Sequence, residues 1–203
     1  MSLELALQRI TELQTMLNPA PVAAAATAAP QATQAFSTAL QSATTPASLS
    51  ALPTSGGTNA GRAALAFAQG EVGQAEQPPG SNDSPRIAQY RQATAGSGVG
   101  PWCAYFVSWA ARQAGTPLGD QGQGFGRVDD VWAWGERTGR ATPAAGAQPQ
   151  PGDLIVWDEH IGIVESVDAD GTIHTVEGNS SDQVSERTYG PDGGGAVGYV
   201  RLG

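Results

Sequence analysis

The order of apolar and polar positions divides the chain into a helical part followed by a strand part. Apolar residues recur at helical spacing in four stretches. They predict helices over residues 59–73, 84–94, 103–115 and 128–139. Ser84 is expected to cap the second helix, and Pro85 occupies the first helical position after it. Gly73 and Gly115 are typical of helix ends, and the third stretch is apolar on most sides, which indicates a buried helix.

After residue 152 the pattern changes to short apolar runs separated by turns rich in Gly, Asp and Asn. These runs predict strands over 153–157, 160–167, 172–177, 183–189 and 196–202. Helices followed by antiparallel strands indicate the α+β class. We therefore expect helices packed on an antiparallel sheet of about five strands.

Two segments of different composition precede this globular part. Residues 1–17 carry leucine and isoleucine at helical spacing, which predicts a short amphipathic helix. Residues 18–58 are rich in Ala, Pro, Thr, Ser and Gln, which predicts a disordered linker. The expected domains are therefore this helix, the linker and a globular domain over 59–203. The helix is either a frayed tail or a segment that docks on a partner.

Charge and length exclude several classes of protein. The 203 residues carry a formal net charge of -9 and include no lysine. Such a chain lacks the basic patches that bind nucleic-acid phosphates or anionic membranes. No apolar run has the length of a transmembrane helix, and the N-terminus lacks the basic and apolar regions of a Sec signal peptide. We expect a soluble protein with no nucleic-acid or membrane partner, which would need another route if it is exported.

Cys103 is the single cysteine of the chain and lies at the start of the third predicted helix. One thiol cannot close an intrachain disulfide, and one cysteine with two scattered histidines does not supply a zinc site. Two interpretations remain, a small buried apolar residue or a nucleophile. The free N–H groups and the dipole at a helix N-terminus would favour the thiolate that a nucleophile requires.

A thiol nucleophile needs a base, and both histidines of the chain lie in one predicted hairpin. A two-residue loop within Asp168–Gly171 would form its turn. Counting outward pairs Val167 with Thr172, Gly162 with Glu177 and His160 with Asn179. Cross-strand partners share a face, so His160, Glu177 and Asn179 converge there, and Gly162 leaves room beside Glu177. His174 falls on the other face, opposite Glu165, where a surface pair is expected.

A thiol, an imidazole and a polar partner are the parts of a cysteine amidohydrolase. Cys103 would attack an amide carbonyl and form a thioester, while His160 would take the thiol proton and return one to the leaving amine. Glu177 or Asn179 would hold the imidazole ring, and the residues leave open which of the two does so. The backbone N–H of Cys103 would stabilise the oxyanion.

Three segments in order, "PWCAYFVSW", "PGDLIVWDEHIGIVESV" and "TVEGN", resemble the CHAP family of cysteine, histidine-dependent amidohydrolases and peptidases. The resemblance extends from roughly residue 62 to the end of the chain. It implies a papain-like α+β fold and cleavage of an amide bond in bacterial peptidoglycan. The family's nucleophile and base match Cys103 and His160, and its further polar residues match Glu177 and Asn179.

The resemblance also implies ligands and partners. Trp102 and Asn82 would line the substrate groove. No cofactor is implied, and "AGSGVGPWC" lacks the carboxylates with which some phage members bind calcium, so we expect no metal. The N-terminal "MSLELALQRITELQ" resembles the start of some actinobacterial flagellum-associated wall hydrolases. This implies a flagellar export or rod component as a partner of the N-terminal helix.

The expected location is outside the cytoplasm, in the periplasm or cell wall or fully secreted, after flagellar export or, as the rival, release in phage lysis. We expect a monomer. Two other functions stay open: a non-catalytic structural or binding module of a flagellum or phage tail, and an amidase that acts on a small peptide conjugate. The intact Cys103, His160 and Glu177 argue against the first of these. Whether the enzyme is an N-acetylmuramoyl-L-alanine amidase or an endopeptidase is also open.

Overall fold

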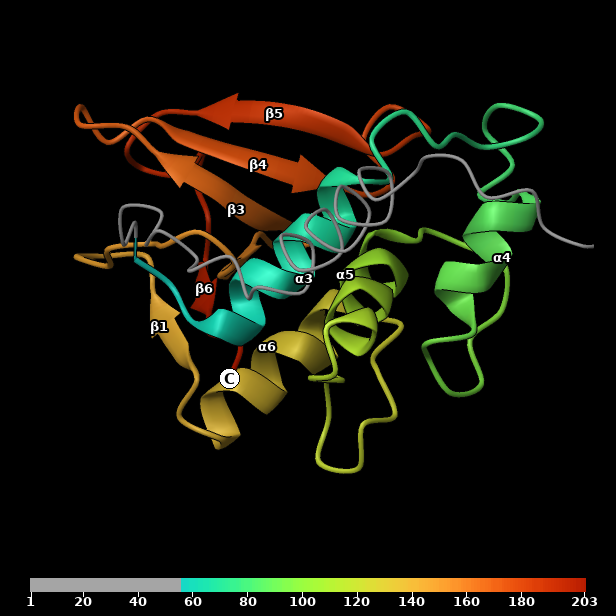
Figure 1. Cartoon of the computed structure of the whole chain (residues 1–203), viewed down its shortest axis with the longest axis horizontal. Coiled ribbons are helices and arrows are strands. Elements are labelled where there is room, and N and C mark those ends of the chain that lie inside the picture. Colours follow the sequence, from blue (N-terminus) through green and yellow to red (C-terminus); the bar gives the residue numbers. More distant parts are fainter. Residues whose placement is uncertain (1–55) are drawn as a thin grey trace, which may run out of the picture. The chain divides into compact units, whose positions relative to one another are not determined.

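A computed structural model describes residues 56–203 of the chain. The helix expected over residues 1–17 lies outside the described residues, as does the linker expected over 18–58 apart from its last three positions. The described part has the α+β arrangement predicted from the sequence, in which helices come first along the chain and an antiparallel sheet follows them (Figure 1).

The described residues form four helices, and each begins within a residue of the predicted start. They are α3 (Asn59–Gln69), α4 (Pro85–Arg91), α5 (Cys103–Gln113) and α6 (Val128–Arg137). The predicted end of the first helix at Gly73 is wrong, because α3 stops at Gln69 with Gly70 as its C-cap. Beyond this cap the N–H of Gly73 donates to Val184, so a contact with the distant strand region replaces further helix. The Ser84 side chain caps α4, as predicted, by accepting from the N–H of Ile87.

Within residues 56–203, six strands form one antiparallel sheet in the order β1-β6-β2-β3-β4-β5 (Figure 1). They are β1 (Ala141–Pro143), β2 (Leu154–Val156), β3 (Ile161–Val167), β4 (Ile173–Glu177), β5 (Ser185–Tyr189) and β6 (Gly198–Val200). The sequence pattern missed β1, a three-residue edge strand that pairs only with β6. Its mostly exposed residues show no apolar periodicity, and they end in a proline, which is tolerated only at a sheet edge.

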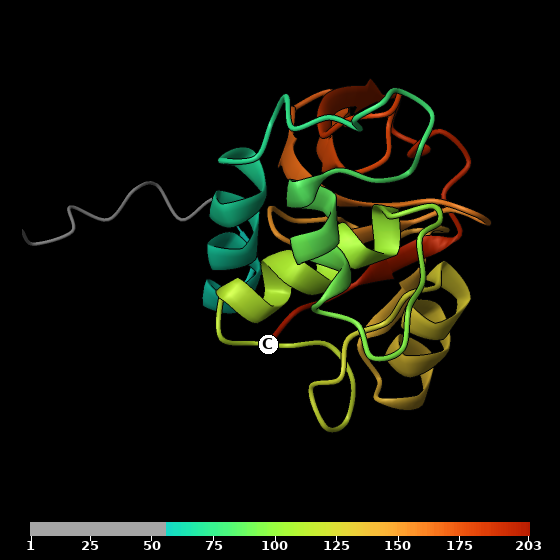
Figure 2. The ribbon, with the colours of Figure 1, turned by 90° about the vertical axis from the view of Figure 1, so that its right-hand side faces the viewer.

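Side-chain alternation along β3 divides the apolar residues between the two faces of the sheet. Ile161 and Ile163 join the main core with the helices, whereas Val164 belongs to a second, smaller cluster on the other face. Helix α5 lies at the centre of the main core, where it packs against α3, α4 and β3 (Figure 2). Its burial confirms the expectation for the third apolar stretch.

The hairpin that carries both histidines has a different turn from the predicted one. The pairs nearest the turn are Val167 with Ile173 and Ser166 with His174, so Asp168–Thr172 connect the strands and the expected two-residue loop is wrong. A bulge at Glu165 adds one residue to β3, and beyond it Val164 pairs with Thr175 and Ile163 with Val176. The longer turn and the bulge cancel, so the predicted register holds beyond the bulge. His174 lies opposite Ser166 and not, as expected, opposite Glu165.

The end of β4 comes close to the start of α5 at Gly178. A Cβ atom at Gly178 would lie 2.5 Å from the Cβ of Phe106 and 2.9 Å from the ring of Trp102. Only a glycine allows this approach, which brings the residues beside Gly178 to the helix end where Cys103 lies. The fold thus joins two segments that are far apart in the sequence.

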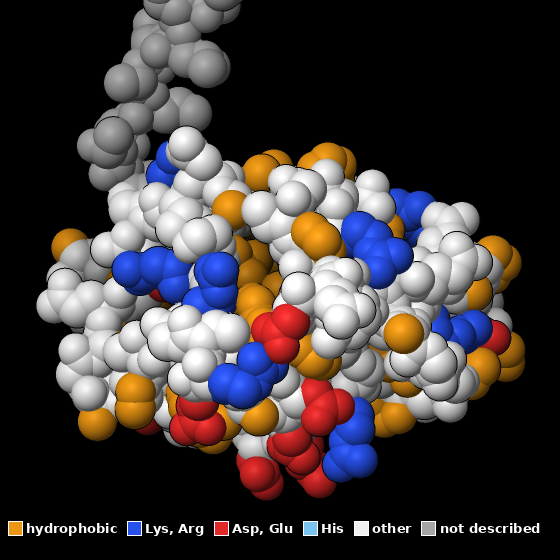
Figure 3. All heavy atoms as spheres, turned by 90° about the horizontal axis from the view of Figure 1, so that it is seen from below, with side chains coloured by type: hydrophobic (Ala, Val, Ile, Leu, Met, Phe, Trp, Pro, Cys, Tyr) orange, Lys and Arg blue, Asp and Glu red, His pale blue; other side chains and the backbone are white. Residues whose placement is uncertain are grey.

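The surface carries charges of both signs. The face seen in Figure 3 has arginine and carboxylate side chains together, with several carboxylates gathered along one edge. Within residues 56–203, no helix combines the length and the apolar character needed to cross a membrane.

Candidate active site

Cys103 is the first residue of α5; its thiol is free, and the residue is 4% exposed. The cap position before it is occupied by Trp102, whose side chain makes no capping hydrogen bond. An indole has a donor and no acceptor, so it cannot satisfy the N–H groups of the first helical turn. These N–H groups therefore stay available beside the sulfur, at the positive end of the helix dipole.

His160 lies immediately before β3, in the short turn that follows β2. The N–H of Trp157 donates to the carbonyl of His160 over 2.9 Å and closes this turn. The Nε2 atom of His160 lies 2.8 Å from Oε2 of Glu177, which belongs to the neighbouring strand β4. Since Nε2 is engaged by the carboxylate, Nδ1 is the nitrogen left for a proton exchange with a thiol.

Glu177 is 1% exposed and has three hydrogen-bond partners. His160 contacts Oε2, while the hydroxyls of Thr175 and Tyr189 donate to Oε1 over 2.6 and 2.9 Å. A buried carboxylate is costly unless hydrogen bonds and an opposite charge compensate it. Despite burial, which raises the pKa of Glu177, its hydrogen bonds with His160 and Thr175 hold that pKa below the ordinary value. The side chain is therefore an ionised and immobilised partner for the imidazole.

Gly162 gives this carboxylate its space. A Cβ atom at Gly162 would lie 2.7 Å from Cγ of Glu177, closer than side-chain atoms approach one another. The expectation that Gly162 leaves room beside Glu177 is therefore confirmed, because the register beyond the bulge sets these two residues on one face.

The pKa of His160 is raised to about 9. Burial lowers it, but hydrogen bonds with Cys103 and with Glu177 raise it by more, and the negative charges of both groups add to the increase. His160 thus carries a proton at neutral pH. Glu177 contacts the imidazole at 2.8 Å, and its negative charge stabilises that proton.

Asn179 follows Gly178 and has a left-handed backbone with φ 59°. It lines the same open hollow of about 490 Å³ as His160, Glu177 and Tyr189. Among the described residues, its side chain has no hydrogen-bond partner, whereas Glu177 contacts the imidazole directly. The geometry therefore favours Glu177 as the residue that orients His160.

The structure corrects the expectation for Trp102, which is fully buried and has no surface for a substrate. Its indole N–H donates to Oε1 of Glu76 over 2.9 Å, and Oε2 of the same carboxylate accepts from the N–H of Asn82 over 2.8 Å. Glu76, itself 3% exposed, thus ties the loop before α4 to the residue that precedes Cys103. Asn82 is half-buried with φ 54°, and its role in substrate binding stays a prediction.

The sequence did not predict three side chains of the site. Thr175 and Tyr189 bind Glu177, and Trp157 lies between His160 and Tyr189, with ring centroids 5.5 and 5.0 Å away. The indole N–H of Trp157 donates to the carbonyl of Gly193 and fixes the ring. Alternation along β4 would have placed Thr175 on the face of Glu177. No local pattern indicates Trp157 or Tyr189, because Trp157 lies in the turn after β2 and Tyr189 reaches Glu177 from the neighbouring strand β5.

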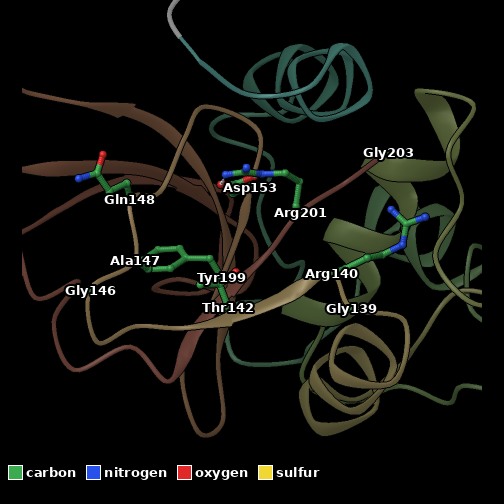
Figure 4. A pocket seen from close by; sticks show the side chains of 10 residues that line it. All are labelled: Gly139, Arg140, Thr142, Gly146, Ala147, Gln148, Asp153, Tyr199, Arg201 and Gly203. Carbon is green, nitrogen blue, oxygen red and sulfur yellow. Dashed lines mark hydrogen bonds and ion pairs between the residues drawn. The ribbon is translucent and has the colours of Figure 1, made fainter.

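A second hollow, of about 400 Å³, lies between β6 and the segment after β1 (Figure 4). Two of its charged side chains form an ion pair, since Arg201 donates to both oxygens of the buried Asp153 over 3.0 and 2.8 Å, while the guanidinium of Arg140 lies 5.3 Å from the ring centroid of Trp134. Figure 4 shows no cysteine or histidine among its lining side chains. Within residues 56–203, no group of three or more His, Cys, Asp or Glu side chains is placed to hold a metal ion.

Comparison with known proteins gives one family match. Residues 94–179 match the family model described as the CHAP domain. This range contains Cys103, His160, Glu177 and Asn179, and Asn82 lies before it. A search of curated proteins finds no match. One similar solved structure is that of an N-acetylmuramoyl-L-alanine amidase from Staphylococcus aureus, with 20% identity and a TM-score of 0.39. The match covers 53% of this chain and 33% of that chain, so it spans about a third of the solved amidase.

Proposed function

We propose that this chain, which carries a CHAP domain, is a peptidoglycan hydrolase that cleaves an amide bond by cysteine chemistry. The observation that carries the proposal is the arrangement around His160. One ring nitrogen contacts the ionised Glu177 at 2.8 Å, and the nearby Cys103 contributes to the raised pKa of the same imidazole. A nucleophile, a base and an orienting carboxylate in this order are the working parts of thiol-dependent acyl transfer.

The first half-reaction forms a thioester. The sulfur of Cys103, whose proton has passed to Nδ1 of His160, attacks the amide carbonyl, and the carbonyl electron pair moves to oxygen. The N–H groups of the first turn of α5 donate to this oxyanion, since the cap residue does not occupy them. The C–N bond then breaks as His160 gives its proton to the leaving amine.

The second half-reaction releases the enzyme. Water attacks the thioester while His160 accepts one of its protons, and the C–S bond breaks to give a carboxylic acid and the cysteine thiolate. Glu177 keeps the ring in place and stabilises the imidazolium in both halves. Trp157 lies against one side of the imidazole, which limits the access of water and holds the ring orientation.

The test uses purified sacculi and the full chain. The wild-type protein is expected to solubilise them, and Cys103→Ala is expected to have no activity with an unchanged circular dichroism spectrum. His174→Ala is the matched control, because it removes a partly exposed histidine that pairs with Asp168 at another part of the hairpin. Mass spectrometry of the released fragments identifies the cut amide and so separates an N-acetylmuramoyl-L-alanine amidase from an endopeptidase. Binding of sacculi without turnover by the wild-type protein would instead indicate a structural module.

A further inference from the structure

Arg187 lies at the edge of the hollow that contains His160 and is not used by the reaction described above. It belongs to β5, where it pairs with Thr175, so its side chain lies on the same face of the sheet as Glu177. Arg187, His160 and Asn179 all line the open hollow of about 490 Å³. The residue is exposed, and its guanidinium is therefore accessible to a ligand in that hollow.

Two serine hydroxyls hold the guanidinium in place. Nε of Arg187 donates to Oγ of Ser180 over 2.8 Å, and Nη2 donates to Oγ of Ser181 over 2.6 Å. Left-handed residues on both sides of Ser180, at Asn179 and Ser181, curl this loop toward the arginine. The arginine is thus oriented before any ligand arrives, which reduces the entropy that binding would cost.

The charge of this guanidinium has no carboxylate partner in the described part of the chain. None of the ion pairs within residues 56–203 includes Arg187, and both of its side-chain acceptors are neutral hydroxyls. A guanidinium has five N–H donors, of which the serines take two. The remaining donors can bind a carboxylate in the bidentate geometry that arginine prefers.

We propose that Arg187 is the carboxylate-binding residue of the substrate site, and that the preferred substrate has a free carboxylate near the amide that is cut. This proposal rests on the proposed function and names its substrate class: acidic wall peptides rather than amidated or neutral ones. The charge of the whole chain supports this role. With a formal net charge of -9, the protein repels anions in general, so a single unpaired cation beside His160 provides local selectivity.

The test compares two preparations of the same sacculi, one untreated and one whose carboxylates are converted to carboxamides with a carbodiimide in excess ammonia. The wild-type full chain is expected to cut the untreated sacculi about 10- to 100-fold faster, the range that a lost charged hydrogen bond produces. Arg187→Gln is expected to cut both preparations at the slow rate. Arg137→Gln is the matched control, because this exposed arginine at the end of α6 pairs with Asp120 and lies outside the hollow.

Three results would overturn the proposal. The wild-type protein could cut both preparations at equal rates, or Arg187→Gln could still cut untreated sacculi faster. The third result is an equal loss of cutting rate on both preparations in Arg187→Gln. Equal losses would mean that Arg187 only holds the loop of Ser180 and Ser181. The wild-type comparison needs no variant, so it decides the matter even if Arg187→Gln fails to fold.

A binding measurement separates this proposal from the proposed function. If the wild-type protein cuts neither preparation, the proposed hydrolase activity is wrong. Co-sedimentation of Cys103→Ala with each preparation then tests Arg187 alone. A carboxylate site is supported if Cys103→Ala binds untreated sacculi more strongly, if the double variant with Arg187→Gln loses this difference, and if the double variant with Arg137→Gln keeps it. Equal binding of Cys103→Ala to both preparations contradicts the site.

Discussion

His160 and Glu177 meet across two neighbouring strands, with Nε2 of the imidazole 2.8 Å from Oε2 of the carboxylate. Glu177 is fixed in turn by Thr175 and Tyr189, so the position of the imidazole depends on a carboxylate that cannot turn away. The contact exists because a bulge at Glu165 compensates for a turn that is one residue longer on the β4 side than the pattern predicts. A base, its orienting group and the pKa of the pair all depend on this register.

Glu177→Gln is expected to lower kcat by about 10²- to 10⁴-fold, the range associated with general acid–base catalysis. The amide retains the size of the side chain but loses the charge that stabilises the imidazolium. Asn179→Ala is expected to lower kcat by less than about tenfold, because its side chain has no hydrogen-bond partner in residues 56–203. Single-turnover rates on soluble wall fragments measure both. Equal losses in the two variants would assign the orienting role to Asn179.

The two histidines are expected to respond differently to replacement by alanine. His160→Ala removes the proton acceptor and should reduce hydrolysis to background. His174→Ala should retain most of the activity, because His174 is partly exposed and contacts Asp168 and Thr188 at another part of the hairpin. Turnover of sacculi by equal amounts of each variant gives the comparison. An inactive His174→Ala with active His160→Ala would contradict the site.

The activity is expected to fall as the pH rises through about 9, where His160 loses its proton. Burial lowers the pKa of His160, and hydrogen bonds with Cys103 and Glu177 raise it above the ordinary value. Because the folded-state pKa is raised, the proton also stabilises the fold. This contribution is complete below the unfolded-state value of about 6.5 and disappears as the pH rises through about 9.

The pH dependence of kcat/KM and of the unfolding free energy measures these two effects. In Glu177→Gln the alkaline limb should move to lower pH, since the imidazolium loses a negative partner. An alkaline limb that stays at the same pH in this variant would show that another group controls it.

Gly162→Ala is expected to reduce both activity and stability. Its Cβ would lie 2.7 Å from Cγ of Glu177, and Glu177 cannot move without breaking its hydrogen bonds. Overpacking of this kind costs about 1–3 kcal/mol. Gly70→Ala is the matched control, because its nearest contact would be an ordinary 3.5 Å. Thermal unfolding and initial rates of both variants give the result, and a fully active Gly162→Ala would mean that Glu177 is not held rigidly.

EDTA is expected to leave the activity unchanged. The described residues offer no group of three or more His, Cys, Asp or Glu side chains placed to hold an ion, and the loop before Cys103 has no carboxylate. Hydrolysis of sacculi is measured with EDTA and then with added calcium. Loss of activity in EDTA that calcium restores would contradict the expectation.

The sequence by itself determined the features that depend on local periodicity. The helical spacing placed Cys103 at the start of a buried helix, and the switch to short apolar runs identified five of the six strands within residues 56–203. The two-residue alternation put Glu177 and Gly162 on one face of a hairpin, and this relation holds in the structure. Such features follow from neighbouring residues along the chain, because backbone geometry repeats every 3.6 or 2 residues.

Only the tertiary structure decided which side chains meet. The turn and the bulge at Glu165 are two local irregularities whose effects on the strand register cancel, and no residue pattern predicts either one. The burial of Trp102 follows from its contact with Glu76 and from the approach of Gly178, and both belong to distant segments. Likewise, Tyr189 binds Glu177 only because β5 lies beside β4. These contacts depend on how the elements pack in space, and the periodicity of a single segment carries no information about its neighbours.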